Sequence, residues 1–140
     1  MFSLEISYIA LAISTVLSFM LGGFWYSPKA FGKMWMNQMG VTMNDIEDSG
    51  KSHSRALVAS FFSSLFMCLV VGMLISSLQV SSVWQGVLVG IVLFLGLNFT
   101  SSLKLVFWED RPVKLTMIDA GYDVSCFILA GAIFAYTQSI

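Results

Sequence analysis

Four long apolar segments dominate the chain, and short polar segments separate them. The apolar segments cover residues 3–26, 54–78, 82–107 and 114–137. Each is long enough to supply the roughly 20 residues that a membrane-spanning helix needs. The pattern predicts an all-α fold, an integral membrane four-helix bundle that forms a single domain over residues 1–140.

The positive charges follow the same pattern, because they lie beside only the first and the third polar gap. The residues concerned are Lys29, Lys33, Lys51 and Arg55 at the first gap, and Lys104, Arg111 and Lys114 at the third. Short loops rich in Lys and Arg stay in the cytoplasm. We therefore expect both basic loops to be cytoplasmic and both termini to lie on the opposite side of the membrane.

Composition agrees with a membrane protein and argues against nucleic-acid binding. Hydrophobic residues make up 57% of the 140 residues and charged residues only 11%, against about 45 to 50% and about 25% in soluble domains. The net charge of -1 leaves no basic face for nucleic acid. The lipid bilayer is the expected partner. Cys68 and Cys126 fall inside predicted spans, so we interpret them as packing residues rather than as a disulfide or metal site.

The first gap contains the main extended polar segment, and residues 28–40 predict a short interfacial helix within it. Pro28 suits the first position of a helix, and Gly40 suits a left-handed end. Apolar and aromatic residues recur between them at helical spacing, as in amphipathic interfacial helices. The alternative is an irregular loop whose aromatic residues pack against the bundle. Residues 44–50 are acidic and predict a solvated turn.

Small residues recur at every fourth position along the first two predicted membrane helices. In lipid, close backbone approach through such stripes supplies much of the helix contact. A tight seam is therefore expected between these helices, and the short second gap predicts that the second and third helices are antiparallel neighbours. The two stripes are Ala10, Ser14, Ser18 and Gly22, and Ala56, Ser60, Ser64, Cys68, Gly72 and Ser76.

The last apolar segment contains Asp119, Tyr122 and Asp123, which we take as a candidate intramembrane polar site. At about 1.5 Å per residue, Asp123 lies near mid-membrane. Asn98 and Lys104 lie at matching depths on the third helix, so we predict the pairs Asn98 with Asp123 and Lys104 with Asp119. Ionisable groups in membranes usually face protein or water. The pairs form either a structural clasp or a proton- or ion-coupled site.

Sequence motifs for enzyme chemistry are weak. Gly50-Lys51-Ser52 resembles the end of a phosphate-binding loop, but Asp45 stands where the pattern needs glycine. His53 is the only histidine, which leaves little basis for a metal site or a catalytic triad. We expect no enzyme activity, no catalytic residues, no metal and no cofactor.

The segment after the first membrane helix resembles the signature of a known family. The specific residues are Trp25, Tyr26, Pro28, Phe31, Gly32 and Trp35, with a weaker likeness at Trp108, Glu109, Arg111, Asp119, Gly121 and Tyr122. The family comprises small bacterial membrane proteins catalogued as a domain of unknown function, DUF1761. The resemblance implies a multi-pass protein of the bacterial inner (plasma) membrane and transfers no activity.

We call the segment from Trp25 to Trp35 the signature corner. In it, Trp25 and Tyr26 are expected to anchor the helix end at the headgroups, and Pro28 to redirect the chain. Glu109 and Arg111, on the same side, are expected to clamp this corner.

Two functions remain open, with a third that has less support. The leading interpretation is a non-enzymatic assembly or interaction protein whose partner is a second copy or another membrane protein. The alternative is a small oligomeric proton- or cation-coupled transporter or channel. A membrane enzyme acting on lipid or quinone is the third. Acids that face a cavity favour transport, whereas acids that face a dry partner favour a structural role.

Overall fold

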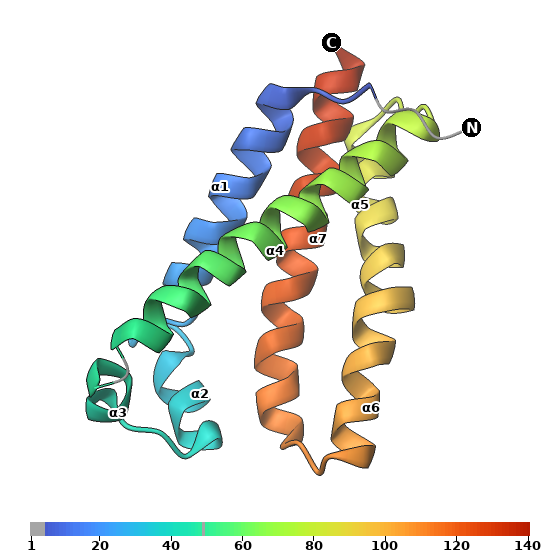
Figure 1. The fold of residues 1–140 in the computed structure, drawn as a ribbon. Helices are drawn as coiled ribbons and strands as arrows, with labels where there is room; N and C mark the ends of the chain where they lie inside the picture. Colours follow the sequence, from blue (N-terminus) through green and yellow to red (C-terminus); the bar gives the residue numbers. More distant parts are fainter. Residues whose placement is uncertain (1–4, 49) are drawn as a thin grey trace.

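The structure, a computed structural model, describes residues 5–48 and 50–140 and is helical throughout its regular elements (Figure 1). Residues 3 and 4 of the first predicted span lie outside the described residues. The long helices are α1 (Tyr8–Trp25), α4 (Gly50–Ser77) and α7 (Val113–Ser139), and a third span is built from α5 (Val83–Leu93), the π-helix η1 (Phe94–Phe99) and α6 (Thr100–Trp108). Two short helices, α2 (Gly32–Met39) and α3 (Met43–Asp48), fill the first gap. Four helices are thus long and apolar enough to cross a membrane, which confirms the predicted fold class.

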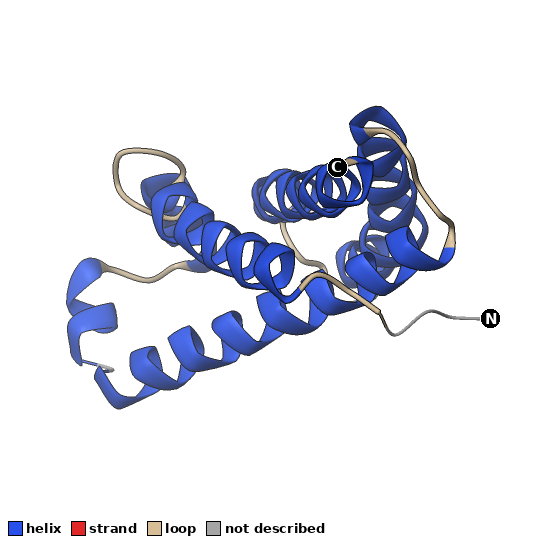
Figure 2. Ribbon diagram, turned by 90° about the horizontal axis from the view of Figure 1, so that it is seen from above, coloured by secondary structure: helices blue, strands red, loops and turns tan. Residues whose placement is uncertain are grey.

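Helix α7 occupies the centre, and α1, α4 and α5 each pack against it. The C-terminus and the first described residues, which precede α1, lie at one end of the molecule, whereas α2, α3 and the α6–α7 turn lie at the other (Figure 1). Seen from above, the helices surround α7 incompletely (Figure 2). Both basic gaps therefore share one end of the molecule, as the charge pattern requires, while the side of the membrane that this end faces stays a prediction.

The closest helix pair is α5 with α7, and glycines bring their backbones together. A Cβ atom on Gly86 would overlap the backbone carbonyl of Gly131, and one on Gly90 would overlap the carbonyl of Phe127. No larger residue fits at these points without moving a backbone. Small residues thus provide the contact here, as expected for helices in lipid.

The predicted seam between the first two membrane helices forms, but only along part of α4. Ala10, Ser14 and Ser18 of α1 are fully buried, and the Ser18 hydroxyl lies 4.0 Å from the buried Cys68 sulfur. Both cysteines are free thiols. Further toward the start of α4, Ala56 and Ser60 of the same stripe are exposed.

The expectation that α4 and α5 lie side by side along their length is wrong. Helix α4 crosses the bundle diagonally, with its C-terminal end near α5 and its N-terminal half far from α6 (Figure 1). Helix α4 contacts α1 and α7 much more than α5. The short turn joins only the ends of α4 and α5. The rest of α4 packs against α1 and α7 instead, with Cys68 against Ser18 of α1. The divergence leaves a space between α4, η1 and α7.

The first gap also differs in detail from the prediction. Helix α2 begins at Gly32 rather than at residue 28, because residues 28–31 form a turn in which the Ser27 carbonyl accepts from the Ala30 and Gly32 amides. Helix α2 ends as predicted at Gly40, whose φ of 69° is left-handed. The acidic segment contains α3 rather than an open turn. Thr42 and Asp45 cap that helix reciprocally, side chain to backbone.

Candidate functional site

The signature corner folds inward onto α7. The Trp25 indole nitrogen donates a 3.0 Å hydrogen bond to the Ile118 carbonyl oxygen. A Cβ atom on Gly121 would lie 2.8 Å from the Trp25 ring, so only glycine leaves room for the indole. Trp25 therefore packs between α1 and α7, while its expected role as a headgroup anchor stays a prediction. An indole packs in this way when its N–H finds an acceptor inside the protein.

The turn after α1 is held by close backbone contacts. The Phe31 amide donates to the Trp25 carbonyl at 2.9 Å, and the two rings lie 4.7 Å apart between centroids. Gly32 sits so close to the carbonyls of Tyr26 and Ser27 that a side chain would collide with them. Pro28 lies in the turn itself. The spacing of the signature residues thus corresponds to a tightly folded corner.

Asp119 is fixed by two groups, one from the signature corner and one from the turn before α7. The Tyr26 hydroxyl donates to its Oδ1 at 2.6 Å, and the Arg111 guanidinium forms an ion pair with its Oδ2. We call this set of three residues the clasp. The Trp35 ring packs edge-on against Tyr26 with centroids 5.9 Å apart.

The predicted partner of Asp119, Lys104, is not part of the clasp. Lys104 is exposed on α6, and within the described part of the chain the ion pair of Asp119 is with Arg111. Helix α6 diverges from the corner, whereas the short turn before α7 returns Arg111 toward it. Glu109, expected beside Arg111, is exposed at the end of α6. Arg111 therefore connects this turn to Tyr26 of the corner through Asp119, which both residues contact.

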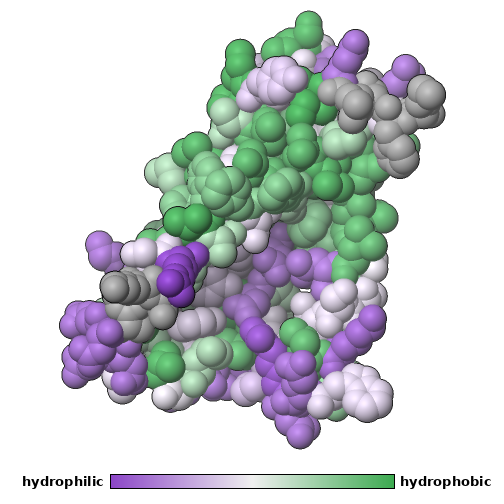
Figure 3. All heavy atoms as spheres, in the orientation of Figure 1, coloured by the Kyte–Doolittle hydropathy of each residue, from purple (hydrophilic) through white to green (hydrophobic). Residues whose placement is uncertain are grey.

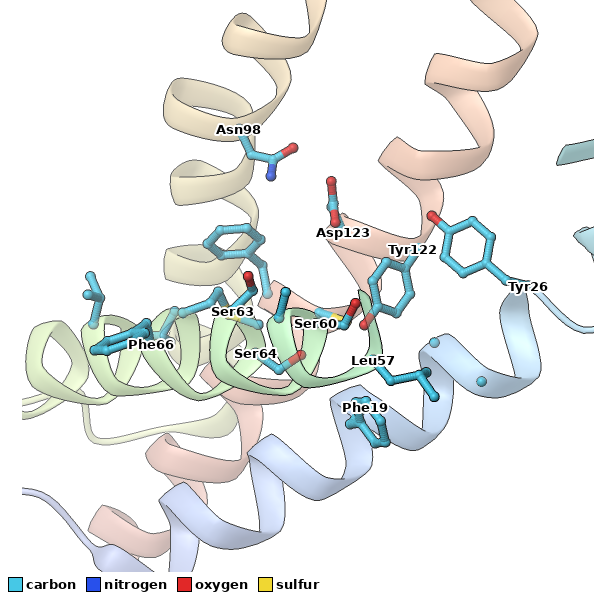
Figure 4. A pocket seen from close by; sticks show the side chains of 18 of the residues that line it. Phe19, Tyr26, Leu57, Ser60, Ser63, Ser64, Phe66, Asn98, Tyr122 and Asp123 are labelled. Atoms are coloured by element: carbon cyan, nitrogen blue, oxygen red, sulfur yellow. The ribbon is translucent and has the colours of Figure 1, made fainter. Parts of the chain in front are cut away.

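A cavity of about 1050 Å³ lies where α4 diverges from the third span (Figure 4). Its walls come from the C-terminal end of α1, the first two thirds of α4, the α5–η1 region and α7. Hydrophilic atoms are visible inside the hollow in the lower half of the molecule (Figure 3). Polar groups thus gather below the continuous apolar surface of the bundle.

Asp123 and Asn98 meet in this cavity from opposite helices. Both line the cavity, Asn98 from η1 and Asp123 from α7, and their side chains point into it (Figure 4). Asn98 Oδ1 is buried and has no hydrogen-bond partner among the described residues. The structure therefore brings this predicted pair together and leaves an acceptor free beside it.

Tyr122 connects the cavity with the clasp. Its hydroxyl donates a 2.9 Å hydrogen bond to the Ser18 carbonyl, which joins α7 to α1. Its ring packs edge-on against Tyr26 with centroids 5.5 Å apart. Tyr26 in turn lines the cavity and bonds to Asp119. The three predicted residues of the last helix thus divide into two neighbouring environments, a clasp at Asp119 and a cavity at Asp123.

The π-helix η1 is a feature that sequence reasoning missed. Asn98 belongs to it, and the hydroxyls of Thr100, Ser101 and Ser102 donate to the carbonyls of Gly96, Leu97 and Asn98 respectively. These hydroxyls give the carbonyl oxygens an additional hydrogen-bond donor in the segment where the backbone hydrogen bonds change from the α-helical to the π-helical pattern. π-helical turns are frequent at functional sites. The available sequence signal for this irregular helix was the run Thr100-Ser101-Ser102, which begins four residues after Gly96.

Helix α4 contributes a polar strip that was also missed. Ser60, Ser63 and Ser64 line the cavity opposite Asp123, with His53 at the end of the strip nearest α3 (Figure 4). The sequence predicts a helix-packing role for Ser60 and Ser64 and neither a metal-binding nor a catalytic role for His53. Their recurrence on one face was visible, but nothing in the sequence indicated that α4 would turn this face toward Asp123.

The chain matches a protein family along almost its whole length. The family model describes a protein of unknown function (DUF1761) and matches residues 9–135. The chain belongs to this family. The match to DUF1761 includes every residue of the corner, the clasp and the cavity. None of the curated proteins and none of the solved structures compared with the chain matches it.

Proposed function

We propose that this DUF1761 protein is a small proton- or cation-coupled transporter whose solute site is the cavity at Asp123. The orientation of Asp123 carries the proposal. Asp119 faces a phenol and a guanidinium and so has a structural partner. Asp123 faces a cavity of about 1050 Å³ and an amide with a free acceptor. The orientation of Asp123 thus favours transport over a purely structural polar pair.

The Asp123 carboxylate can bind either a cation or a proton, so that binding of one releases the other. A carboxylate inside a membrane protein needs a positive partner or a proton, and the described cavity wall contains no Lys or Arg. Arrival of a cation stabilises the charged carboxylate, whereas departure of the cation favours protonation. The protein would act without chemical conversion of the solute, so we propose that it is not an enzyme.

The location and orientation follow from the same arrangement. We infer a bacterial inner-membrane protein with the basic loops in the cytoplasm and both termini outside. The grouping of both basic gaps at one end of the molecule supports this topology (Figure 1). The cavity then lies in the cytoplasmic half of the protein.

Assembly with a second copy or another membrane protein is a further candidate role, and one observation favours it. Ala56 continues the small-residue stripe of α4 beyond its seam with α1, where it is exposed and lies outside the cavity lining. Close helix approach through such residues is a common basis of association in membranes. We therefore propose that the transporter is an oligomer.

Flux into proteoliposomes tests the proposed transport function. The purified chain would be reconstituted with an internal pH-sensitive dye, and protons, Na⁺, K⁺ and organic cations would be applied as gradients. We expect a cation-driven pH change with the native chain that is lost in Asp123→Asn. Glu109→Gln is the matched control, since it makes the same change at an exposed site, and should retain flux. No flux from the native chain across this panel would contradict the proposal.

A further inference from the structure

The charge of the cavity lining defines the first property of its ligand. Asp123 is the one carboxyl group among the described lining residues, and no Lys or Arg is among them. His53, at the end of the serine strip, is the one basic side chain in this described lining. An anion near Asp123 would meet a like charge with no compensating cation, whereas a monocation would meet its counterion.

The hydrogen-bonding groups define the second property. The Asp123 carboxylate accepts hydrogen bonds only, and Asn98 Oδ1 is a buried acceptor without a partner in the described structure. An unpaired buried acceptor is unfavourable until a donor reaches it. Asn98 Oδ1 is covered in this structure, so the side chain must turn toward the cavity before a ligand can donate to it. A cation that carries N–H groups then satisfies both acceptors, whereas a quaternary ammonium supplies charge without a donor.

The rest of the wall defines the third property. Phe19, Phe66 and Phe127 line the cavity together with aliphatic side chains such as Leu97 and Val70. The Tyr122 ring also borders it and presents an aromatic surface beside Asp123 (Figure 4). Aromatic rings attract organic cations as well as apolar groups. The volume of about 1050 Å³ lies at the upper limit of sites for drug-sized molecules, about 300 to 1,000 Å³, and far exceeds what a bare metal cation needs.

We propose that the cavity binds hydrophobic protonated amines, with the ammonium group between Asp123 and Asn98 and the apolar body against the phenylalanines. This inference rests on the proposed function and names its solute class. The amine competes with a proton for Asp123, which supplies the coupling. Inorganic cations are poor ligands because the wall offers few oxygens to replace their water shells.

Three probes that share a naphthylmethyl group and differ only in their polar group test this assignment. They are 1-naphthylmethylamine, its trimethylammonium analogue and 1-naphthylmethanol. Binding would be measured by calorimetry at pH 7.5 to the full chain in nanodiscs of zwitterionic lipid, with empty nanodiscs subtracted. We expect the amine to bind about tenfold or more tightly than the alcohol, because a charge-assisted hydrogen bond contributes more than a neutral one. The trimethylammonium probe should fall between them.

Variants then locate the head group. Asp123→Asn should reduce amine affinity about tenfold or more and leave alcohol affinity unchanged. Asn98→Leu should reduce affinity for the amine more than for the trimethylammonium probe, because only the amine donates to Oδ1. Glu109→Gln should change nothing. Size-exclusion profiles show whether each variant is folded, and the comparison of the three probes on the native chain needs no variant.

The outcomes separate this inference from the proposed function. Equal affinities of the native chain for amine and alcohol, or tighter binding of the trimethylammonium probe, overturn the amine assignment. Cation-driven flux that depends on Asp123 would in that case still support transport of another solute. Amine binding at Asp123 without flux supports the assignment and contradicts transport.

Discussion

The Tyr26 hydroxyl and the Asp119 carboxylate are joined by a 2.6 Å hydrogen bond across 93 residues of sequence. This bond ties the end of the first membrane helix to the last one. Because the Tyr26 ring also packs against Tyr122 and lines the cavity, the clasp fixes one wall of the proposed solute site. The signature residues are therefore structural supports for the cavity rather than a separate site.

Removal of the Tyr26 hydroxyl should destabilise the fold. Tyr26→Phe leaves the ring in place and removes the donor to Asp119, so we expect a loss of about 1 to 2 kcal/mol in the free energy of unfolding. Unfolding by dodecyl sulfate from mild detergent micelles measures this. Tyr8→Phe is the control, since Tyr8 is 79% exposed and should have little effect. Equal stability of the two variants would show that the bond contributes nothing.

The same bond predicts a dependence on alkaline pH. Burial and, next, the hydrogen bond to Asp119 raise the pKa of Tyr26, whereas in the unfolded chain it is about 10. The folded protein therefore keeps a proton that the unfolded chain loses above that pH, so this contribution to stability is complete below about pH 10 and declines above it.

Thermal unfolding in detergent between pH 8 and 11 measures the effect. The native chain should lose more stability over this range than Tyr26→Phe, which has no group to ionise at this position. Parallel curves for the two proteins would contradict the assigned role of the phenol.

Arg111 and Lys104 should differ in importance, because only Arg111 forms the ion pair with Asp119. The pair is partly exposed, so we expect Arg111→Ala to lower the free energy of unfolding by about 1 kcal/mol. Lys104→Ala removes the cation first predicted to pair with Asp119 and should leave stability almost unchanged. A larger effect of Lys104→Ala would indicate that the sequence-based pairing is the correct one.

The sequence predicted most of the fold, because the membrane constrains it strongly. Four apolar segments and two basic gaps were enough for the helices and for the alternation of loops. The small residues around Ser18 and Cys68 also indicated the α1–α4 seam. These features depend on local composition and on spacing along one helix, which the sequence displays directly.

Features that depend on helix angles could not be predicted in this way. The divergence of α4 from α6, and hence the cavity, results from packing of α4 against two other helices. Depth matching brought Asn98 to Asp123 correctly but assigned Lys104 to Asp119, because depth alone does not say which way a turn directs its side chains. The turn before α7 brings Arg111 back to Asp119 instead.

The central claim is that a water-accessible cavity reaches Asp123 within the membrane, and thiol labelling tests it most directly. Single cysteines would be placed at Ser63 and Phe62 in a background where Cys68 and Cys126 are alanine. Both positions are exposed at the same depth of α4, but Ser63 lines the cavity and Phe62 does not. In proteoliposomes, a charged and membrane-impermeant thiosulfonate should modify Ser63→Cys readily and Phe62→Cys hardly at all. Equal resistance of both positions would mean that the cavity is filled or closed, and would contradict the account.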